Sequence, residues 1–207
     1  MANATYNETI NPDLLEEALS SDYLVNDHID VLRNKVFDFA GKEWGLTRKQ
    51  LEKVMEKITY HETGRTMDPK QRQINGPAGG SFQFEQRASK KYPKASGSAI
   101  TAENRMINFL TRKGRGLNLP LDYVKSITGS MSDDFSKIDK RLQDIAFLTN
   151  YLEHPSAESG LSKAATDDEA LKDWYLDIQW AGAHEDRPDR LETFSGNLES
   201  YYRKHGR

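Results

Sequence analysis

Apolar residues recur three and four positions apart in several segments of the chain, and this spacing limits the fold more than any other feature. Such a period places the apolar side chains along one face of a helix. In the segment 26–39 they are Ile29, Leu32, Val36 and Phe39. Gly41 and Gly45 follow, and we expect them to end this helix.

A second predicted helix has a signal at each of its ends. Thr47 is a suitable N-cap, and Gln50, three positions later, completes a capping box. Leu46 precedes the cap and is expected to pack on Leu51. The buried stripe consists of Leu51, Val54, Met55 and Ile58. Gly64 adopts left-handed conformations easily and is predicted to close the helix.

The rest of the chain is also predicted to be mostly helical. The predicted helices run from Thr101 to Gly114, from Ser132 to Pro155, from Ala170 to Ala181 and from Phe194 to Tyr202. Residues 65–80 and 156–168 lack a helical period and predict loops. The four residues 81–84 alternate between polar and apolar side chains, which predicts a short strand.

These segments predict a mainly α protein with a small β-like or irregular element near residues 76–84. No internal repeat and no low-complexity linker divides the sequence. We expect residues 1–25 to form an N-terminal arm or short helix and residues 26–155 to form the main domain. Residues 156–207 are expected to form a helical extension that packs on the same domain.

Composition excludes several kinds of chemistry. The chain contains no cysteine, which excludes disulfides, thiolate metal sites, iron–sulfur clusters and thiol nucleophiles. Its 29 Lys and Arg against 32 Asp and Glu give a net charge of −3, which argues against nucleic acid as a partner. The sequence has no apolar run of about 20 residues and no signal-peptide pattern, so we expect no membrane partner.

Glu62 is the carboxylate that the helical pattern singles out. It follows Leu51 by eleven residues, which at about 100° per residue leaves it only about 20° away from Leu51 around the helix. We therefore expect its side chain beside the apolar stripe and at the negative end of the helix dipole. Both surroundings raise the pKa of a carboxyl group, as a general acid near neutral pH requires. The alternative is an ordinary solvent-facing glutamate at a frayed helix end.

Two short motifs follow each other around Glu62. The sequence Glu62-Thr63-Gly64 ends the predicted helix, and the stretch GPAGGSFQFE follows at 76–85. This pair resembles the catalytic core of the goose-type lysozyme and lytic transglycosylase superfamily, especially its divergent, virion-associated bacteriophage members. The likeness covers residues 50–86 and extends, from the helical layout, through about residue 154.

The resemblance implies a lysozyme-like helical catalytic domain that cleaves the MurNAc-GlcNAc β-1,4 glycosidic bond of peptidoglycan. It implies that Glu62 is the general acid and that Ser81 and Gln83 lie along the glycan cleft. The family's Ala-Tyr-Asn-Ala-Gly motif has no good copy in this chain. Within residues 145–152, Tyr151 is a candidate either for the cleft or for packing between helices.

The mechanism depends on whether a second carboxylate takes part. Asp68 in the predicted loop and Glu85 after the predicted strand are the two candidates. In lytic transglycosylases one acid suffices, because the N-acetyl oxygen of the substrate stabilises the cationic centre and the sugar's 6-hydroxyl attacks it. By this resemblance we favour a lytic transglycosylase over a hydrolytic lysozyme, used by a phage to breach the cell wall.

The partners implied are peptidoglycan glycan strands and, for a virion component, other virion proteins. The expected location is the phage particle, or the host cytoplasm before release. The rival interpretation is a non-catalytic phage structural or adaptor protein that retains a lysozyme-like fold. The net charge of −3 is more typical of a virion component than of a free lysozyme that adsorbs to an anionic wall.

The histidines, an aromatic cluster and a basic stretch are the remaining candidates for function. The five histidines do not have the spacing of a metal site, so no metal and no cofactor is predicted, and His61 is expected at the surface or behind the site. The aromatic residues Trp174, Tyr175 and Trp180 fit a core or interface stripe, or a platform for sugar stacking. The basic stretch is expected to be a solvated face, or a surface that steers an anionic wall polymer; it contains Arg87, Lys90, Lys91 and Lys94.

Overall fold

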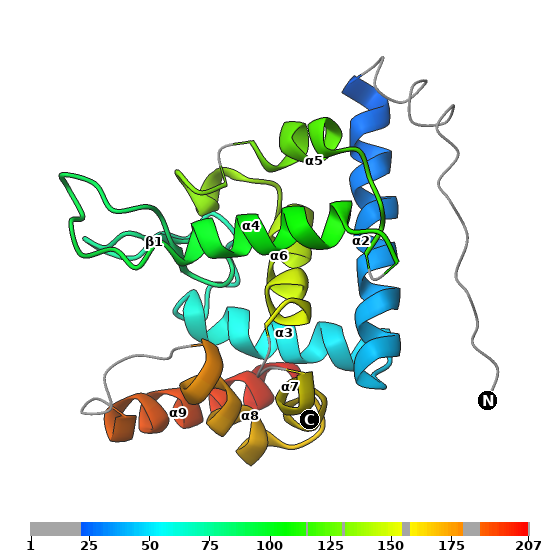
Figure 1. Cartoon of the computed structure of the whole chain (residues 1–207). Coiled ribbons are helices and arrows are strands. Elements are labelled where there is room, and N and C mark those ends of the chain that lie inside the picture. The colour runs from blue at the N-terminus through cyan, green and yellow to red at the C-terminus, as the bar shows by residue number, and fades with distance from the viewer. Residues whose placement is uncertain (1–21, 115, 130, 155–157, 180–186, 207) are drawn as a thin grey trace.

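The computed structural model describes residues 22–114, 116–129, 131–154, 158–179 and 187–206. Within these ranges the chain is mainly helical, as predicted, and has one two-stranded sheet (Figure 1). Most of the predicted N-terminal arm, residues 1–21, lies outside the described ranges. None of the helices in the described part combines the length and the apolar character that crossing a bilayer requires.

The elements follow one another along the chain in a simple order. The first four are α2 (Asp22–Trp44), α3 (Arg48–Glu62), β1 (Ala78–Gly79) and β2 (Phe84–Glu85). Next come α4 (Ser98–Thr111), α5 (Leu121–Thr128), the 3-10 turn η1 (Phe135–Lys137) and α6 (Lys140–Leu152). The last are α7 (Glu158–Ala164), α8 (Asp168–Trp174), the π-helix η2 (Tyr175–Gln179) and α9 (Arg187–His205).

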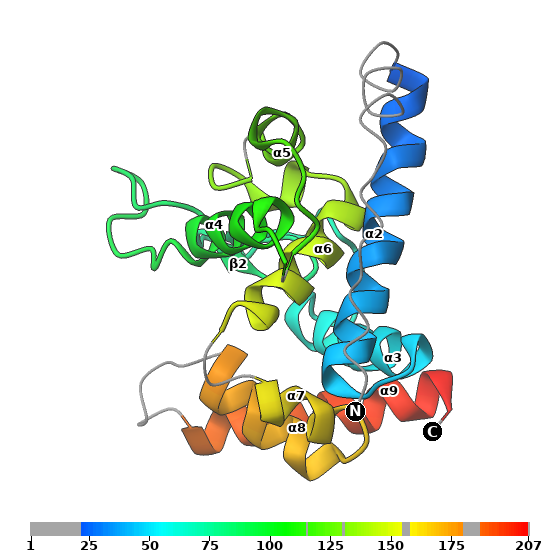
Figure 2. The ribbon, with the colours of Figure 1, turned by 45° about the vertical axis from the view of Figure 1, so that its right-hand side comes forward.

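Helix α6 crosses the middle of the molecule, between α2 and α4 (Figures 1 and 2). Every residue from Leu142 to Leu152 is buried. A helix that is covered on all sides needs partners for its charged groups. Asp144 has them, because it accepts hydrogen bonds from Arg33 Nε at 2.9 Å and from Lys140.

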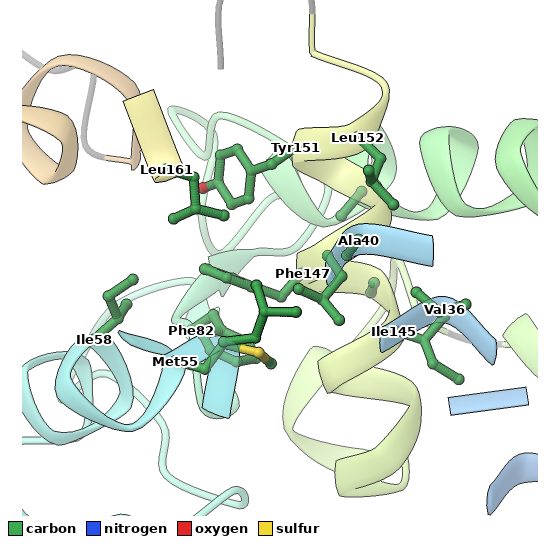
Figure 3. Close-up of a cluster of buried hydrophobic side chains, with 14 of the residues drawn as sticks. Val36, Ala40, Met55, Ile58, Phe82, Ile145, Phe147, Tyr151, Leu152 and Leu161 are labelled. Atoms are coloured by element: carbon green, nitrogen blue, oxygen red, sulfur yellow. The ribbon is translucent and has the colours of Figure 1, made fainter. Parts of the chain in front are cut away.

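Figure 3 shows part of the core that surrounds α6, with side chains from α2, α3, α6, α7 and the turn between the strands. Its labelled members are Val36, Ala40, Met55, Ile58, Phe82, Ile145, Phe147, Tyr151, Leu152 and Leu161. The rings of Phe82 and Phe147 stack with centroids 4.2 Å apart. Burying one such side chain contributes about 2–3 kcal/mol. This contact therefore fixes the turn between the strands against α6.

Both predicted ends of α3 are confirmed. Gln50 N donates to Thr47 Oγ1 at 3.3 Å, and Thr47 N donates to Gln50 Oε1 at 2.9 Å, which is a complete capping box. At the other end Gly64 has a φ of +57°, and the amide of Arg65 donates to the carbonyl of Tyr60 at 2.7 Å. The Gly64 amide donates to the carbonyl of His61. These two bonds form a Schellman motif, so α3 ends in a fixed turn.

The predicted strand over residues 81–84 is wrong. The strands are β1 and β2, which pair antiparallel with Gly79 opposite Phe84, and residues 80–83 form the turn between them. Gly80 and Gln83 both have positive φ, and Gln83 N donates to the carbonyl of Gly80 at 3.3 Å. The alternating side chains therefore lie mostly in a reversal of the chain and not along an extended segment.

Three predicted helix starts are also wrong. Helix α4 begins at Ser98, so Thr101 lies within its first turn. The segment from Ser132 first forms η1, and α6 starts only at Lys140, because Asp139 accepts a hydrogen bond from the amide of Arg141 and caps it. Helix α8 starts at Asp168 and not at Ala170, after Asp167 as its N-cap.

Two helices were not predicted, and two are longer than predicted. Helix α5 is absent from the prediction, and α7 occupies part of the predicted loop at 156–168, where Leu161 and Ala164 are buried. Helices α2 and α9 extend beyond the predicted ranges 26–39 and 194–202. Short helices such as α5 and α7 show too few apolar repeats to stand out in a sequence.

Helix α9 packs against α3, while α7 packs against α2 and α8, and α8 and α9 lie beneath α3 in Figure 1. Tyr201 Oη donates to Glu56 Oε2 at 2.8 Å, and the hydroxyls of Tyr60 and Ser200 are 3.0 Å apart. These polar contacts lie on the side of α3 that its apolar stripe leaves free. The end of α3, where Glu62 lies, is therefore enclosed between the core and the C-terminal helices.

Candidate functional site

Glu62 is the last residue of α3, and its side chain is half-buried. Its Oε1 accepts a hydrogen bond of 3.0 Å from the hydroxyl of Tyr175, which lies in η2. A bond of this kind stabilises negative charge on the carboxylate and fixes the plane of the group. The carboxyl group therefore does not extend into bulk water, although it is less covered than the apolar stripe beside it.

Tyr175 is held in place by contacts with two other rings. Its ring stacks on Phe194 of α9 at a centroid distance of 4.4 Å and meets His61 edge to face at 4.9 Å. Burial, together with the nearby charge of Glu62, raises the pKa of Tyr175 well above its ordinary value. The phenol therefore stays neutral and keeps its proton for the bond to Glu62.

His61 supports this arrangement from behind. Its Nδ1 accepts a hydrogen bond of 2.9 Å from the side-chain amide of Asn197 in α9. Burial, and the charge of Arg190, lower the pKa of His61 to about 4. The imidazole is therefore neutral at pH 7. Its ring contacts the rings of Tyr175 and Phe194.

Tyr151 of α6 is fully packed. Its ring meets Phe147 at 4.9 Å and Trp174 at 4.8 Å, both edge to face. Burial raises the pKa of its hydroxyl far above the usual range, and the nearby negative charge of Glu62 adds to this effect. Tyr151 thus packs between helices, one of the two roles predicted, while its hydroxyl lies within electrostatic reach of Glu62.

The turn that follows Glu62 is rigid. Thr63 is buried, and its Oγ1 donates to the carbonyl of Thr59 at 2.7 Å and accepts from the amide of Met67 at 3.0 Å. Arg65 Nε donates to Asn197 Oδ1 at 2.8 Å, which ties the turn to α9. The predicted Glu-Thr-Gly motif therefore acts locally, by anchoring the backbone on both sides of the carboxylate.

The second predicted motif is anchored to α6 by Gln143, whose side chain is completely buried. Gln143 Oε1 accepts from the amide of Ser81 at 2.7 Å, and Gln143 Nε2 donates to the carbonyls of Pro69 and Ile138. One side chain thereby joins the loop after α3, the turn between the strands and the start of α6. This amide satisfies several backbone groups that would otherwise be buried without partners.

Ser81 is buried in this turn, and Gln83 holds the turn in its conformation. The side chain of Ser81 has no exposed surface, and its hydroxyl has no hydrogen-bond partner within the described residues. Gln83 is half-buried, and its Nε2 donates to the carbonyls of Gln71 and Gly80 at 3.1 and 2.8 Å. Contact of either side chain with a glycan stays a prediction, and for Ser81 it requires the turn to open.

The two candidates for a second carboxylate each close a turn. Asp68 is exposed, and its Oδ1 accepts from the amide of Lys70 at 2.8 Å. Glu85 Oε2 accepts from the amide of Ser96 at 2.5 Å, at the base of the loop that follows β2. A role in catalysis stays a prediction for both residues.

The sequence did not identify the partner of Glu62. Tyr175 belonged to an aromatic cluster that predicted either a core stripe or a sugar platform, and the structure buries Tyr175 and Trp174; Trp180 lies outside the described residues. No signal in the sequence connects Asn197 or Gln143 to the site. Among the described residues, no group of three or more His, Asp or Glu side chains is arranged to hold a metal ion.

Comparison of the chain with known protein families, with curated proteins and with solved structures finds no match in any of the three. A function for the site therefore has to follow from its own residues. They offer one oriented, half-buried carboxylate, bonded by a buried tyrosine, at the end of a helix whose backbone is fixed on both sides.

Proposed function

We propose that the chain cleaves the MurNAc-GlcNAc β-1,4 glycosidic bond of peptidoglycan, with Glu62 as the general acid. The observation that carries this proposal is the hydrogen bond between Tyr175 and Glu62 Oε1, in a half-buried position at a rigid helix end. A general acid must be held in one orientation to reach the leaving oxygen. Oε1 can accept the bond from Tyr175 whether or not the other carboxyl oxygen carries a proton, so Tyr175 orients the carboxyl group before and after Glu62 gives up its proton.

The proposal includes a lysozyme-like fold over residues 26–155. Support for it comes from the order of the elements, in which the helix that carries the acid is followed by a small sheet and then by a buried central helix. The sheet is joined to the loop after Glu62 by two backbone bonds, from Gln73 N to Ala78 O and from Gly80 N to Gln71 O. The two sequence motifs thus belong to one folded unit.

We favour a lytic transglycosylase over a hydrolase. In this mechanism Glu62 protonates the glycosidic oxygen while the N-acetyl carbonyl oxygen of the substrate stabilises the anomeric centre. The resulting carboxylate then takes the proton of the sugar's 6-hydroxyl, whose oxygen closes the anhydro ring. One acid suffices, and this agrees with the involvement of Asp68 and Glu85 in turn-closing hydrogen bonds.

The test is release of soluble muropeptides from purified peptidoglycan by the full chain and by Glu62→Gln. This variant keeps the shape of the side chain and cannot donate the proton, so we expect release to fall to background. The matched control is Glu52→Gln on the same helix, which removes only a surface ion pair with Arg48 and should release products at the wild-type rate. Undiminished release by Glu62→Gln would remove the assignment.

Mass spectrometry of the products decides between the two mechanisms, because an anhydro end and a reducing end differ by one water. Products with anhydro ends support the transglycosylase. Products with reducing ends would mean that the chain is a hydrolase. Variants of Asp68 and Glu85 would then identify the second carboxylate.

The enclosure of the site favours a second candidate function, that of a non-catalytic virion structural or adaptor protein. Ser81 and Tyr151 have almost no exposed surface, and Tyr175 already occupies one oxygen of Glu62. A chain of this kind would bind glycan strands or other virion proteins from the particle without turnover. Binding to insoluble peptidoglycan with no release of soluble products, by wild type and by Glu62→Gln alike, is the result expected for this function.

A further inference from the structure

The loop that joins β2 to α4 carries a concentrated positive charge. We call residues 86–97 the basic loop; it contains Arg87, Lys90, Lys91 and Lys94 and no acidic residue, in a chain whose net charge is −3. The loop projects from the body of the molecule on the left of Figure 1. We infer that the basic loop is a binding surface for a flexible phosphodiester polymer of the bacterial wall, of the poly(glycerol phosphate) kind.

The charges of the basic loop are available to a partner. All four side chains are exposed. Arg87 Nε lies 3.4 Å from Asp133 Oδ1, and both side chains of this pair are about two-thirds exposed. Arg87 Nη2 also donates to Ser132 Oγ at 3.2 Å. Within the described part of the chain, none of the three lysines forms an ion pair with a carboxylate. They therefore keep their full charge at the surface.

The backbone of the basic loop is already ordered, which lowers the entropy cost of binding. Ser89 N donates to the carbonyl of Tyr92, and Tyr92 N donates to the carbonyl of Ser89, both at 3.1 Å. Lys90 and Lys91 lie between these two residues, at the tip of the turn. At the base of the loop, Glu85 accepts from the amide of Ser96, which holds the two ends of the loop together.

The side chains favour a phosphate polymer without bases over a nucleic acid. Proteins that bind single-stranded nucleic acids combine basic grooves with exposed aromatic rings on which bases stack. The one aromatic ring of the basic loop, Tyr92, is half-buried, and the ammonium group of Lys91 lies 5.0 Å from its centroid. Lysine binds phosphate as a compact point charge and needs no planar partner. Three exposed lysines suit repeated phosphates on a mobile chain.

This inference goes beyond the proposed cleavage and does not depend on Glu62. The basic loop leaves the sheet directly after Glu85, and β2 pairs with β1 next to the loop that follows α3. A wall polymer bound there would hold the protein at the wall whether or not the protein cleaves glycan.

The experiment measures binding of the full chain to a fluorescently labelled poly(glycerol phosphate) by anisotropy, at about 20 mM and about 150 mM salt. The test variant replaces three lysines of the basic loop, as Lys90→Gln, Lys91→Gln and Lys94→Gln together. We expect binding to weaken at least about tenfold at low salt, and the slope of log affinity against log salt to fall by about two.

The matched control makes the same change of charge elsewhere, at three exposed lysines that lie far apart in the sequence: Lys49, Lys113 and Lys125, each replaced by Gln. We expect its affinity to stay within about threefold of wild type, since only the screened net charge changes. Equal weakening by the two variants, or no weakening by the basic-loop variant, overturns the inference. Circular dichroism before each titration checks that both variants are folded.

A second arm uses single-stranded DNA with the same number of phosphates as the polymer. We expect it to bind no more tightly than poly(glycerol phosphate), because Tyr92, the one aromatic residue of the basic loop, is half-buried and leaves little ring surface for stacking. If DNA binds at least tenfold more tightly than the polymer and loses this affinity in the basic-loop variant, the partner is a nucleic acid and the inference fails.

Discussion

The hydroxyl of Tyr175 donates a hydrogen bond of 3.0 Å to Oε1 of Glu62, across 113 positions of the chain. It connects the end of α3 to the π-helix η2 in the C-terminal part. Single π-helical turns often occur at functional sites, because they shift side chains that a regular helix would direct elsewhere. Here the π-helix starts at Tyr175 itself. The carboxylate and its donor are thus positioned by two elements that are remote in sequence.

Tyr175→Phe removes this hydrogen bond and leaves the ring in its stack on Phe194. We expect the free energy of unfolding to fall by about 1–2 kcal/mol, because the bond has a charged acceptor and is partly buried. If the proposed cleavage holds, kcat should fall about tenfold with little change in KM, since only the orientation of the acid is affected. Urea unfolding and muropeptide release measure the two effects.

Tyr60→Phe is the matched control for this prediction. It removes a tyrosine hydroxyl on α3, the helix of Glu62, and the hydrogen bond of this hydroxyl joins it to the neutral side chain of Ser200. A loss of about 0.5–1 kcal/mol of stability and no change in activity are expected. Equal effects of the two variants on activity would show that Tyr175 does not act through Glu62.

The sequence predicts a part of the fold well where all the residues that determine it lie within one turn of the chain. Thr47 and Gln50 are neighbours in the capping box, and Gly64 closes the helix two residues after Glu62. Local chemistry determines such ends, so no knowledge of the rest of the fold is needed. The inward direction of Glu62 follows from the same helical period, and the structure makes this side chain half-buried.

The parts that the sequence did not predict depend on contacts between remote segments. Residues 81–84 alternate like a strand, but Gln143 accepts a hydrogen bond from Ser81 N and fixes a turn there instead. The same holds for Tyr175, whose aromatic neighbours in sequence suggested a stripe, while its hydroxyl bonds a carboxylate on another helix. A pattern shows which residues are buried together, and not which polar atoms meet.

Stability should depend on pH through His61. Burial, and the charge of Arg190, lower the pKa of His61 in the folded chain to about 4, against 6.5 in the unfolded chain. Between these two pH values the unfolded chain binds more protons than the folded chain. The free energy of unfolding therefore has its full value above about pH 6.5 and falls as the pH decreases towards 4. A tenfold change in proton affinity corresponds to about 1.4 kcal/mol, so the loss is about 3 kcal/mol at most.

Urea unfolding at a series of pH values checks this expectation, with His61→Asn as the variant that cannot titrate. The difference in stability between wild type and variant should change across the window from pH 6.5 to 4. His154→Asn is the control: burial and Arg105 lower the pKa of His154 as well, and this side chain is less enclosed. The pH-dependent change in the free energy of unfolding that comes from His154 should therefore be smaller than that from His61. A difference between wild type and His61→Asn that stays constant across the window would contradict the prediction.

The ion pair between Lys57 and Asp168 should hold the C-terminal helices on α3. Lys57 is buried; its Nζ donates to Asp168 Oδ1 at 2.7 Å, and the hydroxyl of Tyr202 donates to both oxygens of the same carboxylate. We expect Asp168→Asn to lower the free energy of unfolding by about 1–3 kcal/mol, because it leaves a buried ammonium group without a counter-charge. The carboxylate is partly exposed, which keeps the loss below that of a fully buried pair.

Chemical denaturation of two further variants isolates the cause. Adding Lys57→Met to Asp168→Asn removes the unpaired charge and should recover at least half of the lost stability. Glu169→Gln changes the neighbouring carboxylate, which is 80% exposed and pairs with Lys172, and should change stability by less than about 0.5 kcal/mol. No recovery in the double variant would mean that the loss comes from the start of α8 and not from Lys57.

Gly80, the one glycine of the turn between the strands, should be difficult to replace. It has a φ of +79°, and a Cβ there would lie 2.6 Å from Phe135 Cδ1 and 2.8 Å from Gln143 Oε1. Gly80→Ala therefore combines backbone strain with a clash against the side chain that holds Ser81. We expect a loss of about 2–4 kcal/mol in thermal or urea unfolding.

Gly114→Ala separates the two causes, because Gly114 has a φ of +84° and nothing within 4 Å of its Cβ position. Its loss should be only about 1 kcal/mol, from backbone strain alone. Equal losses for the two variants would mean that the contact with Gln143 does not constrain this turn.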